Sequence, residues 1–489
     1  MGLKGERFMR IPIIFTFSLI ILSVLVRFGL TDSNSQIRQE IAAEVSQGEV
    51  VPKYQPSQEA SAPLEPVELR LIGKERLPID LPTALHLASA NNLEIAVART
   101  QFLEAKGNSN AAEGSLIPGV SLFFRYGHTD GTLQGTFGEI GDATFNTLNP
   151  ALVARYSLNP GEAIFNAIAA HRIVDATSAN ESLVTQDVLL RVGEEYYELV
   201  EAQSKVKVAE KAVSESKTLL KIAEVLEKQG IGPGADVVRA RAKLAGDEQS
   251  LIQSQNEFRE ASINLALTLK LDSSVTLFPQ DKEIRQITLI DPQIGLDELI
   301  NTAFEKHPAL RRASQEMKAA DAENSGAWLS TLGPEVLFEA QVSGIGTDFG
   351  NIGEREIYQA LIGISISASS YGEIKAAHAR VLRAQILEER THEEIRAGVI
   401  KAYDEGLSAK EKITPTQKEV EAAEESLKLS QVRFQRGLGL SVEVIQAEDE
   451  LANARLNYIK AIVDYNKAQA RLLNELGEIS IESMAGGIQ

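Results

Sequence analysis

The side chains in this sequence that could do chemistry are its histidines, its acid pairs and two glycine-rich turns. The six histidines form no HExxH pair, and the acid pairs at 393–394 and 424–425 lie in charged helical stretches, where such acids usually solvate an exposed face. The glycine-rich segment at 230–234 is not a phosphate loop, because no Gly-Lys-Ser/Thr sequence follows it. The sequence therefore predicts neither an enzyme nor a metal or cofactor site.

The composition excludes several further kinds of site and partner. The chain has no cysteine, which excludes disulfides, thiolate metal sites and a lipid-anchored cysteine. Its 49 Lys and Arg against 68 Asp and Glu leave a net charge of −19, which would repel phosphate, so we expect no nucleic-acid partner. With 44% hydrophobic and 24% charged residues, the composition is that of an ordinary folded protein.

The glycine-rich turns belong to a long internal repeat. The stretch GIGPGADVVRARAKLA (230–245) pairs with GLGLSVEVIQAEDELA (437–452) at a constant offset of 207 residues. An earlier pair, LPTALHLASANNLEI (81–95) and LDELINTAFEKHPAL (296–310), matches at an offset of 215. Two copies of about 200 residues are far longer than solenoid repeats, which indicates tandem duplication of a whole subdomain.

Long heptad helices lead into both turns. In the first copy large apolar residues recur every seven positions, at Val192, Leu199, Val206, Val213 and Leu220. A similar series, interrupted by Gly406, runs from Val399 to Phe434 in the second copy. Apolar residues held at this period predict a left-handed coiled-coil seam.

The expected helix lengths suggest two helical tracks per copy. The first long helix is expected over about 161–229, a length of roughly 100 Å at 1.5 Å per residue. Shorter helices over about 81–117 and 235–271 could stack end to end beside it. The second copy offers about 296–332, 371–436 and 441–476, and Pro415 is expected to kink or break its long helix.

Two runs with period-two alternation precede each long helix. We expect strands at about 118–127 and 150–158, and again at about 334–343 and 358–369. Runs of about ten residues with polar, glycine-rich connections at 127–149 and 343–356 are typical of transmembrane barrels. A soluble antiparallel sheet with one solvated face would show the same alternation. Four strands cannot close a barrel, so a membrane barrel would require an oligomer.

The N-terminus predicts export. In residues 1–30, three basic residues precede the apolar run 11–26, as in a secretory signal, although an uncleaved anchor is the alternative. Residues 31–76 are polar and proline-bearing, as in a linker. The first repeat is then expected over 77–280 and the second over 281–478, and a tail over 479–489.

The duplicated order of short helix, two strands, long helix, turn and short helix resembles the TolC-type outer-membrane efflux proteins, also called outer membrane factors, over about 77–476. The sharpest motifs are the turns GIGPGADVVRA and GLGLSVEVIQA. The resemblance implies a mainly α fold with a β-barrel portion, in which a duplicated long-helix coiled coil forms an α-barrel and four strands per chain contribute to a trimeric transmembrane β-barrel.

The same resemblance implies function and partners. Such a homotrimer would sit in outer-membrane lipid, with a large periplasmic tunnel. It would be the passive channel component of a tripartite efflux or type I secretion system, opened by a periplasmic adaptor (membrane fusion protein) and an inner-membrane transporter. No cofactor is implied.

The resemblance also assigns residues by position. Family acids just after the second turn ring the periplasmic entrance, and Glu443 holds the first such place. Gln446 holds the second, which would halve the formal charge of the ring from six to three in a trimer. Asp236 is the equivalent of Glu443 in the first copy, although acids at a helix N-terminus also serve as simple caps. The implied adaptor-docking tips are Gly230, Ile231, Gly232, Gly437, Leu438 and Gly439, although these glycines would also suit any tight turn.

Two other classes of protein share some of these features. A periplasmic adaptor also has an N-terminal anchor and a helical hairpin, but it usually carries one hairpin rather than two complete copies. A structural coiled-coil spacer of the envelope would need no strands at matched positions of both copies.

Overall fold

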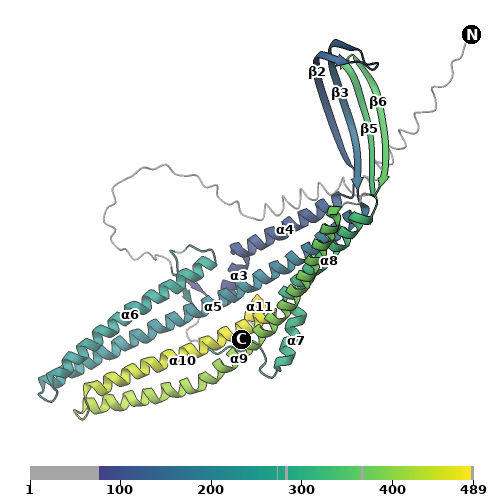
Figure 1. The fold of residues 1–489 in the computed structure, drawn as a ribbon. Helices are drawn as coiled ribbons and strands as arrows, with labels where there is room; N and C mark the ends of the chain where they lie inside the picture. The colour runs from purple at the N-terminus through teal and green to yellow at the C-terminus, as the bar shows by residue number, and fades with distance from the viewer. Residues whose placement is uncertain (1–75, 273, 281–284, 365–367, 486–489) are drawn as a thin grey trace, which may run out of the picture. The chain divides into compact units, whose positions relative to one another are not determined.

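The computed structural model describes residues 76–272, 274–280, 285–364 and 368–485. The expected signal segment and nearly all of the expected linker therefore lie outside the described residues. The longest helices are α5 (Pro160–Lys228) and α9 (Ala368–Gln435), of 69 and 68 residues (Figure 1). No helix of the described part is long and apolar enough to cross a membrane.

Both copies follow the same order of elements, which confirms the duplicated fold. The first copy contains β1 (Arg76–Ile79), α3 (Leu81–Asn91), α4 (Leu93–Gly114), β2 (Gly119–Gln134), β3 (Ile140–Leu158), α5 and α6 (Gly234–Thr268). The second contains β4 (Thr276–Pro279), α7 (Leu296–Lys306), α8 (Pro308–Leu332), β5 (Glu335–Asp348), β6 (Asn351–Gly363), α9 and α10 (Ser441–Glu475), followed by α11 (Ile481–Ala485). Because β4 pairs with β1, we count it with the second copy, although it lies before residue 281, where the second repeat was expected to begin.

The shorter helices of the first copy stack along α5, as the helix lengths suggested. Both α4 and α6 pack against α5 (Figure 1). The end of α6 meets the start of α4, where Asn92 Nδ2 donates a 3.0 Å hydrogen bond to the carbonyl oxygen of Thr268. In the second copy α7, α8 and α10 all contact α9, so each copy supplies two helical tracks.

Residues from both copies share one apolar core. Ile79 of β1, Leu85 of α3, Leu199 of α5, Leu277 of β4 and Met484 of α11 are all buried in it. The parallel pair β1–β4 thus ties the start of one copy to the start of the other. Residues 481–485, expected as part of a tail, form α11 because Met484 inserts into this core.

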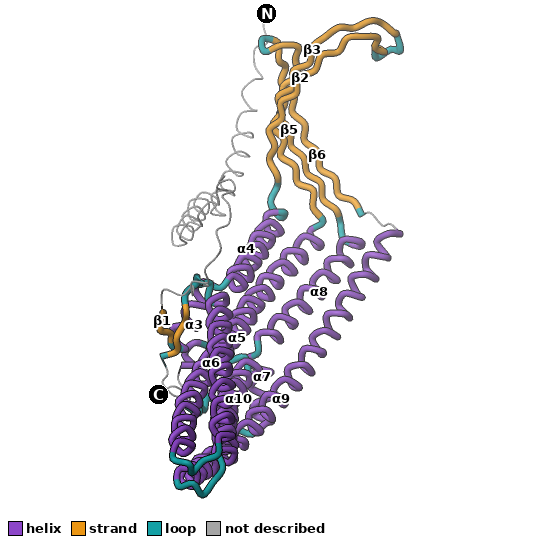
Figure 2. Tube along the Cα trace, turned by 90° about the vertical axis from the view of Figure 1, so that its left-hand side faces the viewer, coloured by secondary structure: helices purple, strands orange, loops and turns teal. Residues whose placement is uncertain are grey.

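Four strands form one antiparallel sheet in the order β2-β3-β5-β6 (Figure 2). The strands are longer than the alternation predicted. Gly127 pairs with Thr147 and Val342 with Glu356, so most of the expected loops at 127–149 and 343–356 is strand. Backbone pairing extends through these Gly-rich and polar residues because ladder hydrogen bonds need no apolar side chain. In contrast, β6 ends at Gly363 rather than at about residue 369.

The expected break at Pro415 does not occur, since α9 continues through it. Proline removes one backbone donor. On either side the helix is held by Ile413, which packs in a cluster with Ala461 and Tyr465 of α10, and by Thr416, whose hydroxyl donates a 2.8 Å hydrogen bond to the carbonyl of Lys412.

Candidate functional site

The turns that join α5 to α6 and α9 to α10 are built alike. Gly230 and Gly437 adopt φ values of +73° and +69°, in the left-handed region that favours glycine. The amide of Ile231 donates to the carbonyl of Leu226 at 3.0 Å, and that of Leu438 donates to Arg433 at 2.9 Å. These bonds satisfy the last carbonyls of α5 and α9, so each glycine ends its helix in the same way.

The two turns contact each other. We call α5 with α6 one hairpin and α9 with α10 the other, and the turn that joins each pair its tip. A Cβ on Gly437 would lie 3.0 Å from Cγ2 of Ile231, so the tip of one hairpin rests on the tip of the other.

Asp236 forms a polar tie between the hairpins. Its Oδ1 accepts a 2.6 Å hydrogen bond from the Ser441 hydroxyl at the start of α10, and a 3.1 Å contact from Nη1 of Arg239. Asp236 is 4% exposed and Ser441 is fully buried. The carboxylate lies in the first turn of α6, where the helix dipole also favours a negative charge. A buried charge with two donors is a strong contact, and it crosses from one hairpin to the other.

The two assigned residues of the second tip lie in different surroundings from Asp236. The Glu443 side chain is 40% exposed, and its Oε2 lies 3.7 Å from Nη2 of Arg433 in its own hairpin. Gln446 is exposed and donates a 3.0 Å hydrogen bond to Glu450 one turn along α10. Within the described residues, no hydrogen bond or ion pair joins Asp236, Glu443 and Gln446 to one another.

The remaining assigned tip residues include a set of exposed apolar side chains. Ile231 is 62% exposed and Leu438 is 72% exposed, and Leu440 and Val442 beside them are also exposed. Large apolar side chains exposed next to one another at the end of a hairpin are typical of a contact surface.

A charged cluster that the sequence analysis missed lies about two to four helical turns from the tips. Nζ of Lys243 in α6 contacts a carboxylate oxygen of Asp247 and lies 2.9 Å from Oδ1 of Asp449 in α10. Beside them Glu448 is 4% exposed, and burial raises its pKa to about 7. The sequence could have predicted that Glu448 is buried, because it lies four residues after Val444 and so on the same face of α10, which is the buried face.

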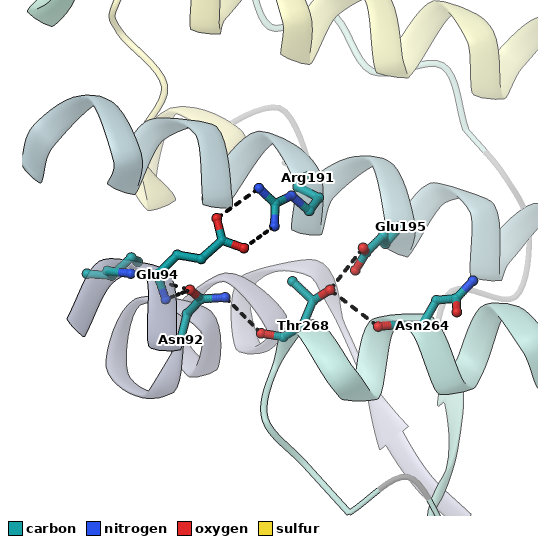
Figure 3. A network of polar contacts seen from close by, with 7 residues as sticks. Asn92, Glu94, Arg191, Glu195, Asn264 and Thr268 are labelled. Atoms are coloured by element: carbon teal, nitrogen blue, oxygen red, sulfur yellow. Dashed lines mark hydrogen bonds and ion pairs between the residues drawn. The ribbon is translucent and has the colours of Figure 1, made fainter. Parts of the chain in front are cut away.

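A second polar network holds the helix junction of the first copy (Figure 3). Arg191 of α5 makes two hydrogen bonds of 2.5 and 3.0 Å to the carboxylate of Glu94 in α4. The Thr268 hydroxyl donates a 2.9 Å hydrogen bond to Glu195 of α5. These contacts join α4, α5 and α6, so we assign the network a structural role.

The equivalent junction of the second copy contains a buried histidine. His307, at an offset of 215 from Asn92, caps α8 by accepting a 3.1 Å hydrogen bond from the amide of Ala309. Burial lowers the pKa of His307 to about 4, so its imidazole is neutral near pH 7. Among the described residues, no group of three or more His, Asp or Glu side chains is arranged to hold a metal ion.

Comparisons with known proteins agree with this architecture. The chain is similar in structure to CusC (TM-score 0.73, 18% identity, covering 82% of this chain and 92% of that one). It is similar to the outer-membrane channel OprN (0.72, 19%, covering 88% and 99%) and to the CmeC outer-membrane channel of Campylobacter jejuni (0.73, 13%, covering 81% and 85%). A search of curated protein sequences found no match.

The sequence model of the family described as "Outer membrane efflux protein" matches both copies, over residues 84–269 and 299–478. These segments contain 186 and 180 residues, or 366 of the 489 in the chain. They include both hairpins, both tips and all four strands of the larger sheet. This chain therefore belongs to the outer membrane efflux protein family.

Proposed function

We propose that this protein is the outer-membrane channel component of a tripartite efflux or type I secretion system, and that it forms a passive conduit through the periplasm. Membership of the family supports the outer membrane as its location and efflux as its role. No enzymatic step is proposed, because a passive conduit requires none. The observation that carries the proposal is the combination of a four-stranded antiparallel sheet with two long helical hairpins in one chain.

The sheet supports assembly as a trimer. In the order β2-β3-β5-β6, the strands β2 and β6 are the two edges. Val120, Leu122, Phe124 and Tyr126 alternate along β2 and so share one face of the sheet, and each is more than half exposed. Phe123, on the other face, is also more than half exposed. Open edges leave backbone N–H and C=O groups unpaired, and an exposed apolar face is unfavourable in water. Closure with two further copies into a twelve-stranded barrel in lipid would pair the edge strands and place the apolar side chains against lipid.

The hairpins supply the gate in this proposal. At rest the tips are held together by the Asp236–Ser441 hydrogen bond and by the contact of Ile231 with Gly437. Glu443, which is partly exposed, would contribute one acid per protomer to the entrance, while Gln446 adds none. A periplasmic adaptor would dock on the exposed apolar tips and separate them, and an inner-membrane transporter would supply the cargo.

The experiment is the native mass, membrane fraction and conductance of the detergent-extracted protein. A trimer of roughly 150 kDa before detergent, from three 53.2 kDa chains less a cleaved signal, is expected in the outer-membrane fraction. In planar bilayers the trimer should conduct ions without an energy source. A monomer, or recovery from the inner membrane, would refute the channel and favour an adaptor.

A further inference from the structure

The seam between the two hairpins contains a small polar cavity near the tips. Its volume is about 130 Å³, and it is bordered by α5, α9 and α10. Its polar lining residues are Ser214, Glu215, Thr218, Gln431, Gln435 and Glu448. Around it pack apolar residues from both hairpins, including Leu219 and Phe434. The cavity therefore lies in the contact surface between the two hairpins, and it would open to solvent if the hairpins moved apart.

Glu448 is unusual within this seam. It is 4% exposed, and within the part of the chain that the structure describes neither of its carboxylate oxygens has a hydrogen-bond partner. An ionised carboxylate buried without partners is strongly disfavoured, whereas the protonated acid is not charged and can donate a hydrogen bond. The site therefore favours the form of Glu448 that carries a proton.

The charges that face Glu448 come from three helices. Glu215 of α5, Asp247 of α6 and Asp449 of α10 each repel a negative charge on it, while Lys243 of α6 attracts one. Lys243 already contacts both Asp247 and Asp449. From α9 the facing side chains are the neutral Gln431 and Gln435. Three acids against one shared lysine leave Glu448 in a net negative surrounding.

We propose that Glu448 is a proton-binding site that locks the two hairpins together when it is protonated and loosens their packing when it is ionised. The proposal rests on the proposed function only in treating the hairpins as a gate. The lock itself is a property of the packing between α5, α6, α9 and α10. It belongs to the second copy alone, because the aligned residue of the first copy is the exposed Arg241.

The direction of the pH effect follows from linkage. Burial raises the pKa of Glu448 from an ordinary 4.5 to about 7 in the packed hairpins. Separated hairpins would expose the carboxylate and restore the ordinary value. The packed form therefore binds the proton more tightly, and its advantage falls as pH rises from about 4.5 to about 7. Between pH 6 and pH 8 the equilibrium constant for packing should fall about tenfold.

The test measures the distance between the hairpins. Because the chain has no cysteine, a pair of cysteines introduced by Lys228→Cys and Lys428→Cys would carry spin labels at exposed positions, at the end of α5 and about two turns before the end of α9. Labelled protein diluted with unlabelled protein in detergent would be measured from pH 6 to pH 8. We expect the distance distribution to lengthen and broaden as pH rises, with most of the change between pH 6 and pH 7.

Three variants make the test specific. Glu448→Gln should keep the short distance at every pH, because a neutral side chain of the same shape mimics the protonated acid. Lys243→Met removes the attracting charge and should move the pH range of this change upward. Asp464→Asn, an exposed carboxylate on the same helix, should behave as the parent protein.

The outcomes separate this proposal from the channel function. A pH response in Glu448→Gln equal to that of the parent, or no response in the parent, would overturn the proton lock. A pH-dependent distance in a protein that conducts no ions would support the lock and refute the channel.

Discussion

Removing the Ser441 hydroxyl should loosen the gate. In Ser441→Ala the carboxylate of Asp236 loses its 2.6 Å donor from the other hairpin, while Arg239, which belongs to the same helix as Asp236, stays in place. The change therefore removes a bond between the hairpins and leaves a bond within one of them. It removes a single oxygen at a fully buried position, so little else in the packing changes.

The magnitude follows from the burial and charge of the pair. A hydrogen bond to a charged group contributes about 1.5–3 kcal/mol. Since Arg239 still compensates the carboxylate, we take the lower end, about 1.5 kcal/mol, which corresponds to roughly a tenfold change in the equilibrium between closed and open tips. The open fraction of a mostly closed channel should rise by about that factor in each protomer.

The assay is single-channel recording in planar bilayers, with the thermal unfolding midpoint measured alongside. Ser250→Ala is the matched control, because Ser250 is exposed and, among the described residues, its hydroxyl bonds only to the carbonyl of Gly246 in its own helix. If Ser441→Ala opens no more often than Ser250→Ala, the Asp236–Ser441 bond does not hold the tips.

Two further predictions concern the duplicated positions. Gly230→Ala should lower the free energy of unfolding by about 1 kcal/mol, because alanine is strained at the positive φ of this position. Gly437→Ala should lower it further, because the new Cβ would also lie 3.0 Å from Cγ2 of Ile231. Urea unfolding measures both losses, and equal losses would contradict the contact between the tips. His307→Asn should reduce acid sensitivity. The depressed pKa of His307 makes the folded state lose up to about 3 kcal/mol as pH falls from about 6.5 to about 4, and asparagine keeps the cap without titrating. The measurement is the melting temperature of both proteins as a function of pH over this range. If the melting temperature of His307→Asn falls with pH as steeply as that of the parent, His307 does not cause the acid sensitivity.

Much of the fold could be predicted from the sequence, because its signals are local and repeated. The heptad series that contains Val192 and Leu199 predicts a long helix whose apolar side must be covered, and the structure buries both residues. Gly230 and Gly437 sit at equal places in both copies, and a positive φ there needs no knowledge of distant contacts. The same matched turns carried the resemblance to the family.

The strand boundaries and Pro415 show where local signals were insufficient. Gly127 and its neighbours lack clear alternation, yet they extend β2 because β3 offers a hydrogen-bonded partner. Likewise α9 passes Pro415, where the loss of one backbone bond is outweighed by packing on α10. In both places the deciding partner lies on another element.

The sequence by itself determined the duplication, the places of the two long helices, the tip turns and the resemblance to the family, since each depends on residues close together in the chain or on the match between copies. Only the tertiary structure decided which acids are buried. Asp236 and Glu443 align, yet Asp236 is buried against Ser441, 205 residues away, and Glu443 is partly exposed. Glu448 has no hydrogen-bond partner among the described residues, and it is buried where α10 meets α5 and α9. Burial and charge depend on what packs on each side chain, and that is settled when distant helices meet.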